Sequence, residues 1–133
     1  MALKITLKPQ EKLIIGGAVL VNGSGRSEFI VESTAPILRQ KDIMSLSDAD
    51  SPCKKIYFAI QLMYVDGKNM AEHHRTYWEL VKDVAGAAPS QKPLLQEISE
   101  NILADRHYQA LKLTKKLIAY EQEAINRVRS SAT

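Results

Sequence analysis

The stretch K-L-I-I-G-G-A-V-L-V, residues 12–21, consists of two short apolar runs separated by a pair of glycines. Short runs of β-branched and other apolar residues, bounded by turn residues, are typical of β-strands. Glycine readily adopts the positive φ that a tight turn requires. The stretch therefore predicts two strands, 12–15 and 18–21, which are joined by a tight turn at Gly16 and Gly17.

Three further strands are predicted around this pair. Residues 3–8 alternate between apolar and polar side chains, which is the pattern of a strand with one buried face. Residues 27–34 alternate in a similar way, and residues 36–39 can form a short edge strand, where a proline is tolerated. Asn22-Gly23 is the strongest short hairpin signal in the chain and predicts a hairpin there. Short strands joined by tight turns indicate a small antiparallel sheet or barrel.

From Ser51 onward the apolar residues follow a helical period instead of a period of two. Ser51-Pro52 suits the start of a helix. We interpret the apolar run 56–65 as a buried helix, although its ten residues also suit a strand. Two further helices are predicted, one from about residue 70 to Gly86 and one from about Pro93. The last helix, from about Tyr108 to Ile125, carries an apolar stripe with lysines on the opposite side.

These elements predict an α+β fold. A small antiparallel, sheet-like or barrel-like unit is expected over residues 1–46, and a bundle of about four helices over residues 51–128. Residues 129–133 are expected to form a frayed tail.

The composition bounds the class of protein. The chain has 133 residues, of which 45% are hydrophobic and 25% charged, as in an ordinary globular protein. No apolar stretch reaches the about 20 residues that a membrane helix needs, and the N-terminus lacks the pattern of a signal peptide. We therefore expect a cytoplasmic protein without a membrane partner. The net charge of +3 permits an anionic partner such as RNA but does not require one.

The sequence predicts no active site, metal site or cofactor. It contains no phosphate-binding glycine loop and no nucleophile elbow. His73 and His74 are adjacent, so in a helix their rings point about 100° apart and do not share an ion. His107 could join one of them, although a site would still need a carboxylate or thiolate within reach. Cys53 has no identifiable base and is interpreted as a small, partly buried packing residue. We therefore expect no enzymatic activity.

Basic residues gather in three places that could face an anionic ligand: the first strand, the segment after residue 38, and the last helix. On the last helix three lysines lie within about one turn, and like charges at this spacing cost about 0.2–0.5 kcal/mol per pair. That cost suggests an anionic partner, although a solvated surface is the simpler explanation for such a patch. The candidate RNA-binding residues are Lys4, Lys8, Arg26, Arg39, Gln40, Lys41, Lys112, Lys115 and Lys116.

Four blocks of the sequence, taken in order, resemble a known family. They are L-K-I-T-L-K-P-Q-E-K-L-I-I-G-G-A-V-L-V-N-G (3–23), A-P-I-L-R-Q-K-D-I-M (35–44), P-C-K-K-I-Y-F-A-I-Q-L-M-Y-V-D (52–66) and H-Y-Q-A-L-K-L-T-K-K-L-I-A-Y-E (107–121). In this combination they resemble FlbT, a family of post-transcriptional regulators of flagellin synthesis in alphaproteobacteria. The resemblance implies a cytoplasmic protein that acts on the 5′ untranslated region of flagellin mRNA. It also implies an association with the companion protein FlaF or with flagellin itself.

A second similarity covers only the first forty-odd residues and concerns the CsrA family of small β-sheet RNA-binding proteins. It rests on residues 11–16, on Ala35-Pro36 and on residues 39–43. It implies a CsrA-like N-terminal unit, which in that family often forms a strand-swapped homodimer. The late arginine of CsrA proteins aligns with Gln40 or, after a slip of one residue, with Arg39. One residue reverses the face of a strand, so the sequence leaves open which of the two faces a ligand.

Two functions follow from these features. The first is an RNA-binding regulator that contacts the flagellin mRNA leader and controls its translation and stability. In this function arginine would read bases or phosphates with two bonds, and the lysines would add affinity. The alternative is a chaperone-like adaptor that binds FlaF or flagellin through a helical surface and acts on the mRNA indirectly.

Overall fold

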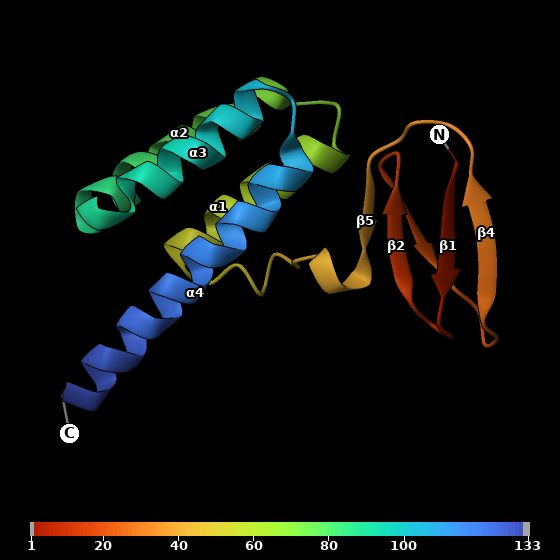
Figure 1. The fold of residues 1–133 in the computed structure, drawn as a ribbon, viewed down its shortest axis with the longest axis horizontal. Coiled ribbons are helices and arrows are strands. Elements are labelled where there is room, and N and C mark those ends of the chain that lie inside the picture. The colour runs from red at the N-terminus through yellow and green to blue at the C-terminus, as the bar shows by residue number, and fades with distance from the viewer. Residues whose placement is uncertain (1, 132–133) are drawn as a thin grey trace. The chain divides into compact units, whose positions relative to one another are not determined.

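The computed structural model describes residues 2–131 and shows an α+β protein, with five strands followed by four α-helices in the described part of the chain (Figure 1). This confirms the predicted fold class. The described residues divide into two compact units. One contains residues 2–43 together with 65–67, and the other contains residues 44–64 together with 68–131.

The strands of the first unit form two small antiparallel sheets. In one, β1 (Leu3–Leu7) pairs with β4 (Ser27–Val31). In the other, β2 (Lys12–Ile15) lies between β3 (Ala18–Val21) and β5 (Ile37–Arg39). All five predicted strands are therefore present, and the proline-containing segment lies at an edge, as predicted.

The glycine pair forms the turn between β2 and β3. Gly16 and Gly17 both have positive φ, +55° and +86°, and Ile15 pairs with Ala18 directly across the turn. A two-residue turn of this kind needs positive φ at both positions, which glycine adopts without a steric cost. The apolar strands on each side are thus held in register by the turn that their sequence predicts.

The hairpin predicted at Asn22-Gly23 is wrong, because β3 pairs with β2 and β4 pairs with β1. The Asn22 side chain instead fastens the loop that separates the two sheets. Its amide nitrogen donates to the carbonyl oxygens of Lys8 (2.8 Å) and Gly25 (2.9 Å), and its Oδ1 accepts from the Ser27 hydroxyl (2.7 Å). Asparagine favours turns because its side chain bonds nearby backbone, and here that property closes a loop between sheets.

The core of this unit contains a buried cluster of Ile5, Leu7 and Leu13, against which half-buried residues of β2, β4 and β5 pack. Ile14 and Leu38, which pair between β2 and β5, are buried as well. The alternation of residues 3–8 places Leu3 on the same face of the strand as Ile5 and Leu7, but Leu3 remains 50% exposed.

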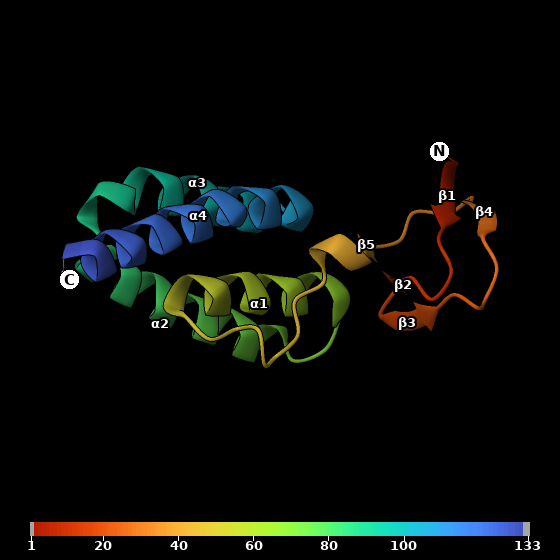
Figure 2. The same ribbon diagram turned by 90° about the horizontal axis from the view of Figure 1, so that it is seen from below.

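The second unit is a bundle of four helices. They are α1 (Pro52–Val65), α2 (Met70–Ala87), α3 (Lys92–Leu103) and α4 (His107–Ser131). Seen from below, α1 and α2 form one layer, and α3 and α4 form the other (Figure 2). The run 56–65 is therefore a helix and not a strand. The helix α4 continues to Ser131, three residues beyond the predicted end of the helical unit at 128, and residues 132–133 lie outside the described part.

The bundle core follows the predicted helical periodicity. Each helix contributes side chains that are almost fully inaccessible to solvent, the largest being Ile56, Ile60, Tyr77, Ile98, Leu111 and Leu117. Tyr77 is the largest of them, and its hydroxyl shares a hydrogen bond with Ser99 Oγ (2.8 Å). A buried hydroxyl needs such a partner. Ile125, which was placed on the inward stripe of the last helix, is 37% exposed.

Candidate nucleic-acid interface

A polar groove of about 830 Å³ lies within the β-rich unit and gathers most of the basic residues that the sequence singled out there. Its walls come from the end of β1, from the loop before β4, and from the end of β5 with the 3-10 turn η1 (Gln40–Asp42). The lining residues are Thr6, Lys8, Pro9, Gln10, Glu11, Arg26, Arg39, Gln40 and Lys41. Five of the nine predicted RNA-binding residues therefore meet in one groove, although they come from segments far apart in the sequence.

The wall after β1 is a tight turn stabilised by Glu11. The Glu11 backbone N–H donates to the Lys8 carbonyl (3.1 Å), and the Lys8 backbone N–H donates back to Glu11 Oε1 (2.9 Å). Gln10 between them has a positive φ of 64°. The hydrogen bond from the Lys8 N–H, with the nearby Arg39 guanidinium, lowers the pKa of the Glu11 carboxyl. Glu11 is thus a fixed negative charge inside a largely basic groove.

The sequence left open whether Arg39 or Gln40 faces a ligand, and in the structure both residues line the groove. Strand β5 ends at Arg39 and η1 begins at Gln40, so the strict alternation of strand faces stops between them. The Arg39 guanidinium donates from Nη2 to the Thr6 carbonyl oxygen (2.7 Å) and lies 3.4 Å from Glu11 Oε2. Gln40 Oε1 accepts a hydrogen bond from the Lys12 backbone N–H (2.6 Å). Both side chains are therefore positioned by the β-unit itself.

Lys8, Arg26 and Lys41 supply the exposed positive charge of the groove. Together with Arg39 they make four cationic side chains against the single carboxylate of Glu11, a local excess of three positive charges. Such a surface attracts polyanions, and arginine in particular can form two parallel hydrogen bonds with a phosphate.

The other predicted residues lie elsewhere. Lys4 is exposed on the β1–β4 sheet, with Nζ 3.4 Å from Glu28 Oε1. Lys112, Lys115 and Lys116 are exposed on α4 in the helical unit, where Lys112 Nζ lies 5.0 Å from the centre of the Tyr108 ring. They form a separate basic patch and do not line the groove.

Four residues that complete the groove wall are not among the nine predicted RNA-binding residues: Thr6, Pro9, Gln10 and Glu11. The segment around Gln10 read only as the end of a strand. The available signal was Glu11, three residues after Lys8. An acidic side chain at this spacing can accept a hydrogen bond from a backbone N–H of its own turn.

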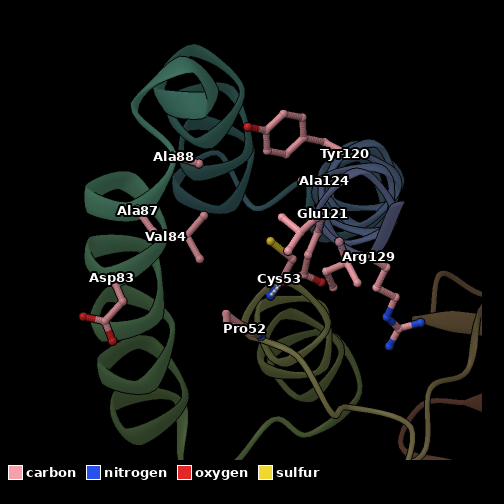
Figure 3. A pocket seen from close by; sticks show the side chains of 12 residues that line it. Pro52, Cys53, Asp83, Val84, Ala87, Ala88, Tyr120, Glu121, Ala124 and Arg129 are labelled. Carbon is pink, nitrogen blue, oxygen red and sulfur yellow. Dashed lines mark hydrogen bonds between the residues drawn. The ribbon is translucent and has the colours of Figure 1, made fainter. Parts of the chain in front are cut away.

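A second groove, of about 640 Å³, lies in the helical unit between α1, α2 and α4 (Figure 3). Val84 and Ala87 of α2 face Tyr120 and Ala124 of α4 across it, and Cys53 lies at its floor (Figure 3). Burial raises the pKa of the Cys53 thiol to about 12, and the Glu121 carboxylate adds to this effect. The thiol is therefore protonated at neutral pH, which agrees with a packing role rather than a nucleophilic one.

His107 begins α4 and is buried, unlike the two histidines of α2. Its Nδ1 lies 3.3 Å from Asp105 Oδ1, whereas its Nε2 is buried without a hydrogen-bond partner among the described residues. Its ring stacks on Tyr64, with 6.4 Å between the ring centres. Burial lowers the pKa of His107, the Asp105 carboxylate opposes that effect, and His74 reinforces it. Within residues 2–131 no three His, Cys, Asp or Glu side chains are grouped as metal ligands would be.

The stability of the protein should fall as the pH drops below the ordinary histidine pKa of 6.5. The unfolded chain then binds a proton at His107 that the folded chain resists, so acid favours unfolding. We expect urea unfolding at about pH 7.5 and about pH 5.5 to show this loss, and the His107→Gln variant to show a smaller one. If the His107→Gln variant loses as much stability between these two pH values as the wild type, His107 is not the source of the pH dependence.

None of the helices in residues 2–131 combines the length and the apolar character that a membrane span requires.

Comparison with known proteins gives a consistent result. The profile of the family described as "Flagellar protein FlbT" matches residues 3–125. A Bradyrhizobium diazoefficiens protein named "Probable flagellum biosynthesis repressor protein FlbT 1" is 42% identical over 124 residues, which are 92% of this chain and 84% of that protein. The "Probable flagellum biosynthesis repressor protein FlbT" of Caulobacter sp. strain K31 is 36% identical over 130 residues, covering 96% of this chain and 99% of the relative.

A third relative extends the match to the whole chain. The "Flagellum biosynthesis repressor protein FlbT" of Caulobacter vibrioides (strain ATCC 19089) is 34% identical over 136 residues, covering 100% of this chain and 96% of its own length. No solved structure matches. The family profile and these relatives cover the β-rich unit and the helices alike, and by both measures the chain belongs to the FlbT family of flagellar proteins.

Proposed function

We propose that this protein, a regulator of flagellar synthesis, acts after transcription by binding the 5′ untranslated region of flagellin mRNA in the polar groove of its β-rich unit. Binding there would control both the translation and the stability of the message. Membership of the FlbT family supports the regulatory role. The groove supports RNA as the ligand.

One observation carries the proposal: Lys8, Arg26, Arg39, Gln40 and Lys41 line the same groove. A local excess of positive charge favours the phosphate backbone, and affinity for nucleic acid then depends on the release of counterions. The groove also holds fixed hydrogen-bonding groups beside its charges, which a simple solvated lysine patch lacks. These groups can read exposed bases of single-stranded loops, the usual target of sequence-specific RNA recognition.

The residues divide into two roles. Lys8 and Lys41 act as point charges toward phosphates and set affinity. Arg26 is exposed, and Arg39 is held by its Nη2 bond to the Thr6 carbonyl. The Arg26 guanidinium can bind a base edge or phosphate with two bonds. Arg39 also uses Nη2 on Glu11 Oε2, so it offers RNA single bonds from Nε and Nη1. Gln40 uses its carbonyl oxygen on Lys12, so its amide N–H groups are the part that can face RNA.

The experiment is a titration of the purified full chain with a labelled flagellin leader RNA and with a scrambled RNA of the same composition, at two salt concentrations. We expect tighter binding to the leader at both salt concentrations, with a steep fall in affinity as salt rises. Equal, weak binding to both RNAs that disappears at the higher salt would reject sequence recognition by this protein.

Two substitutions in the groove test the assignment of roles. We expect Lys41→Ala to weaken binding to both RNAs. The slope of log affinity against log salt concentration should become shallower by about one, as for the loss of one phosphate contact. Arg26→Ala should lower the preference for the leader by about 1–3 kcal/mol, because it removes a base-reading group. Lys4→Ala, which removes another exposed lysine outside the groove, is the matched control. If both groove variants bind like the wild type, RNA does not occupy this groove.

The groove between α1, α2 and α4 supports the second candidate function, that of an adaptor for FlaF or flagellin. Its lining is apolar, with Val84, Ala124 and Val128 among its residues, and such a groove suits the apolar face of a partner helix. The RNA titration repeated with purified FlaF separates the two functions. Leader binding that appears only when FlaF is present would favour the adaptor.

A further inference from the structure

The outer edge of β3 is the most unusual surface of the β-rich unit. All four residues of the strand are apolar and exposed, and Val19, Leu20 and Val21 are 62%, 42% and 58% exposed. An apolar residue on both faces of a strand is typical of a strand with neighbours on every side, whereas an exposed strand normally alternates with polar residues. The sequence of β3 is thus that of an interior strand, but its place in the sheet is an edge.

The hydrogen-bonding groups of this edge are also open. Asn22 N–H donates to the Glu11 carbonyl (2.9 Å), and antiparallel pairs alternate between bonded and non-bonded. In the register of β2 and β3, Leu20 is therefore bonded to Leu13, whereas Val19 and Val21 form the non-bonded pairs with Ile14 and Lys12. The backbone N–H and C=O groups of Val19 and Val21 consequently point away from β2, toward the free edge.

The edge lacks the features that keep natural edge strands apart. Such strands usually carry a lysine, a proline, a bulge or an inward-pointing charge. Here the whole segment 16–25, G-G-A-V-L-V-N-G-S-G, contains no charged residue and no proline. A second copy of the same edge therefore meets no like charge, and its apolar side chains match those of the first. The unit has only about 45 described residues, close to the about 40 below which small domains usually need disulfides, metals or oligomerisation.

We propose that β3 pairs antiparallel with β3 of a second copy of the chain, across a twofold axis at Leu20. In that register Val19 of each copy faces Val21 of the other and exchanges two N–H···O bonds with it, so four bonds form in all. The two Leu20 residues form the non-bonded pair at the axis, where side chains approach most closely. The result is a continuous six-stranded sheet built from two three-stranded sheets.

This contact should be reversible. One strand from each copy buries less than the about 1,000 Å² typical of a stable interface, so we expect a dissociation constant in the range of about 1 to 100 μM. Light scattering or sedimentation of the full chain, over an about hundredfold range of concentration, should show a shift from monomer to dimer. A chain that stays monomeric over the whole concentration range overturns the proposal. This holds even if the β3 edge is found to bind a different protein.

Two variants and a control locate the contact. Val21→Pro removes an N–H that points to the free edge and leaves the hydrogen bonds between β2 and β3 intact. An edge strand tolerates proline at such a position. It should fold, as judged by circular dichroism, but remain monomeric at the highest concentration. Val19→Lys should have the same effect through charge repulsion. Ile30→Lys, at a side chain on β4 that is 61% exposed, is the matched control and should still dimerise. If the control loses the dimer, or both edge variants keep it, the contact is not at β3.

A cross-link tests the register itself. In a Cys53→Ala background, Leu20→Cys places two thiols opposite each other at the axis, where the about 4.5 Å Cα separation of a non-bonded pair allows a disulfide. We expect an oxidised dimer on a non-reducing gel. Leu3→Cys, at another exposed leucine of the same unit, should give none. Equal cross-linking of the two variants would overturn the proposed register.

Discussion

Replacement of Tyr77 by Ala is expected to lower the free energy of unfolding by about 3–5 kcal/mol, the range seen when a buried aromatic side chain is removed. Tyr77 is fully inaccessible to solvent. Its ring packs edge-on against Trp78, with 5.0 Å between the ring centres. Removing the ring leaves a cavity in the bundle that the surrounding helices cannot fully close. Urea unfolding followed by the fluorescence of Trp78, the only tryptophan in the chain, measures the loss directly in this unit.

Tyr77→Phe separates packing from hydrogen bonding. It keeps the ring and removes only the hydroxyl, which shares a hydrogen bond with Ser99 Oγ. Ser99 still donates to the Leu95 carbonyl (2.9 Å), so the remaining group is not left unpaired and the cost should be about 1 kcal/mol. If the two variants lose equal stability, the hydroxyl and not the ring is the main contribution of Tyr77.

Glu121→Ala is expected to cost about 1–3 kcal/mol, because it removes the acceptor that satisfies the first turn of α1. The carboxylate of Glu121, which lies on α4, accepts hydrogen bonds from the Ser51 hydroxyl and from the Cys53 backbone N–H (3.1 Å for the latter). A negative charge at a helix N-terminus is also favoured by the helix dipole. Chemical denaturation of the variant against the wild type measures the loss.

Glu123→Ala is the matched control. Glu123 is exposed, its nearest cation is Arg127 at 3.9 Å, and surface pairs of this kind contribute about 0–1 kcal/mol. A second measurement uses Cys53, the only thiol in the chain. Glu121 adds to the raised pKa of that thiol, so alkylation of Cys53 should become faster in the Glu121→Ala variant. Glu121 would not be a cap if both glutamate variants lost equal stability.

Local sequence rules predicted the elements of this fold well, because most of the elements depend on periodicity and turn residues. Strand β1 and the helices follow their apolar spacing, and the glycine pair at 16–17 adopts the positive φ that its composition suggests. The strong Asn22-Gly23 signal failed because a turn residue determines a bend and not the partner of the strand that follows. Pairing of β4 with β1 buries Ile5 and Leu7 with Leu13, a gain that no local pattern describes.

The basic residues of the candidate groove could be named from the sequence, but their grouping into one groove could not. Lys8, Arg26, Arg39 and Lys41 stood out as basic residues, but nothing in their spacing said that Lys4 would lie outside the groove that they share. The Arg39–Gln40 question could not be answered from a strand register, because the strand ends between the two residues. The buried Nε2 of His107 and the cap formed by Glu121 were equally out of reach, since both depend on contacts between helices.

The sequence by itself determined the α+β class, the five strands and four helices of the described chain, and the turn between β2 and β3. It also determined the uncharged apolar run of β3, because composition and period are properties of neighbouring residues. Only the tertiary structure decided which strands pair, which basic side chains meet, and that β3 lies at an edge with its backbone groups open. Those outcomes depend on contacts between residues far apart in the chain, where burial and hydrogen bonding of the whole unit outweigh local preference.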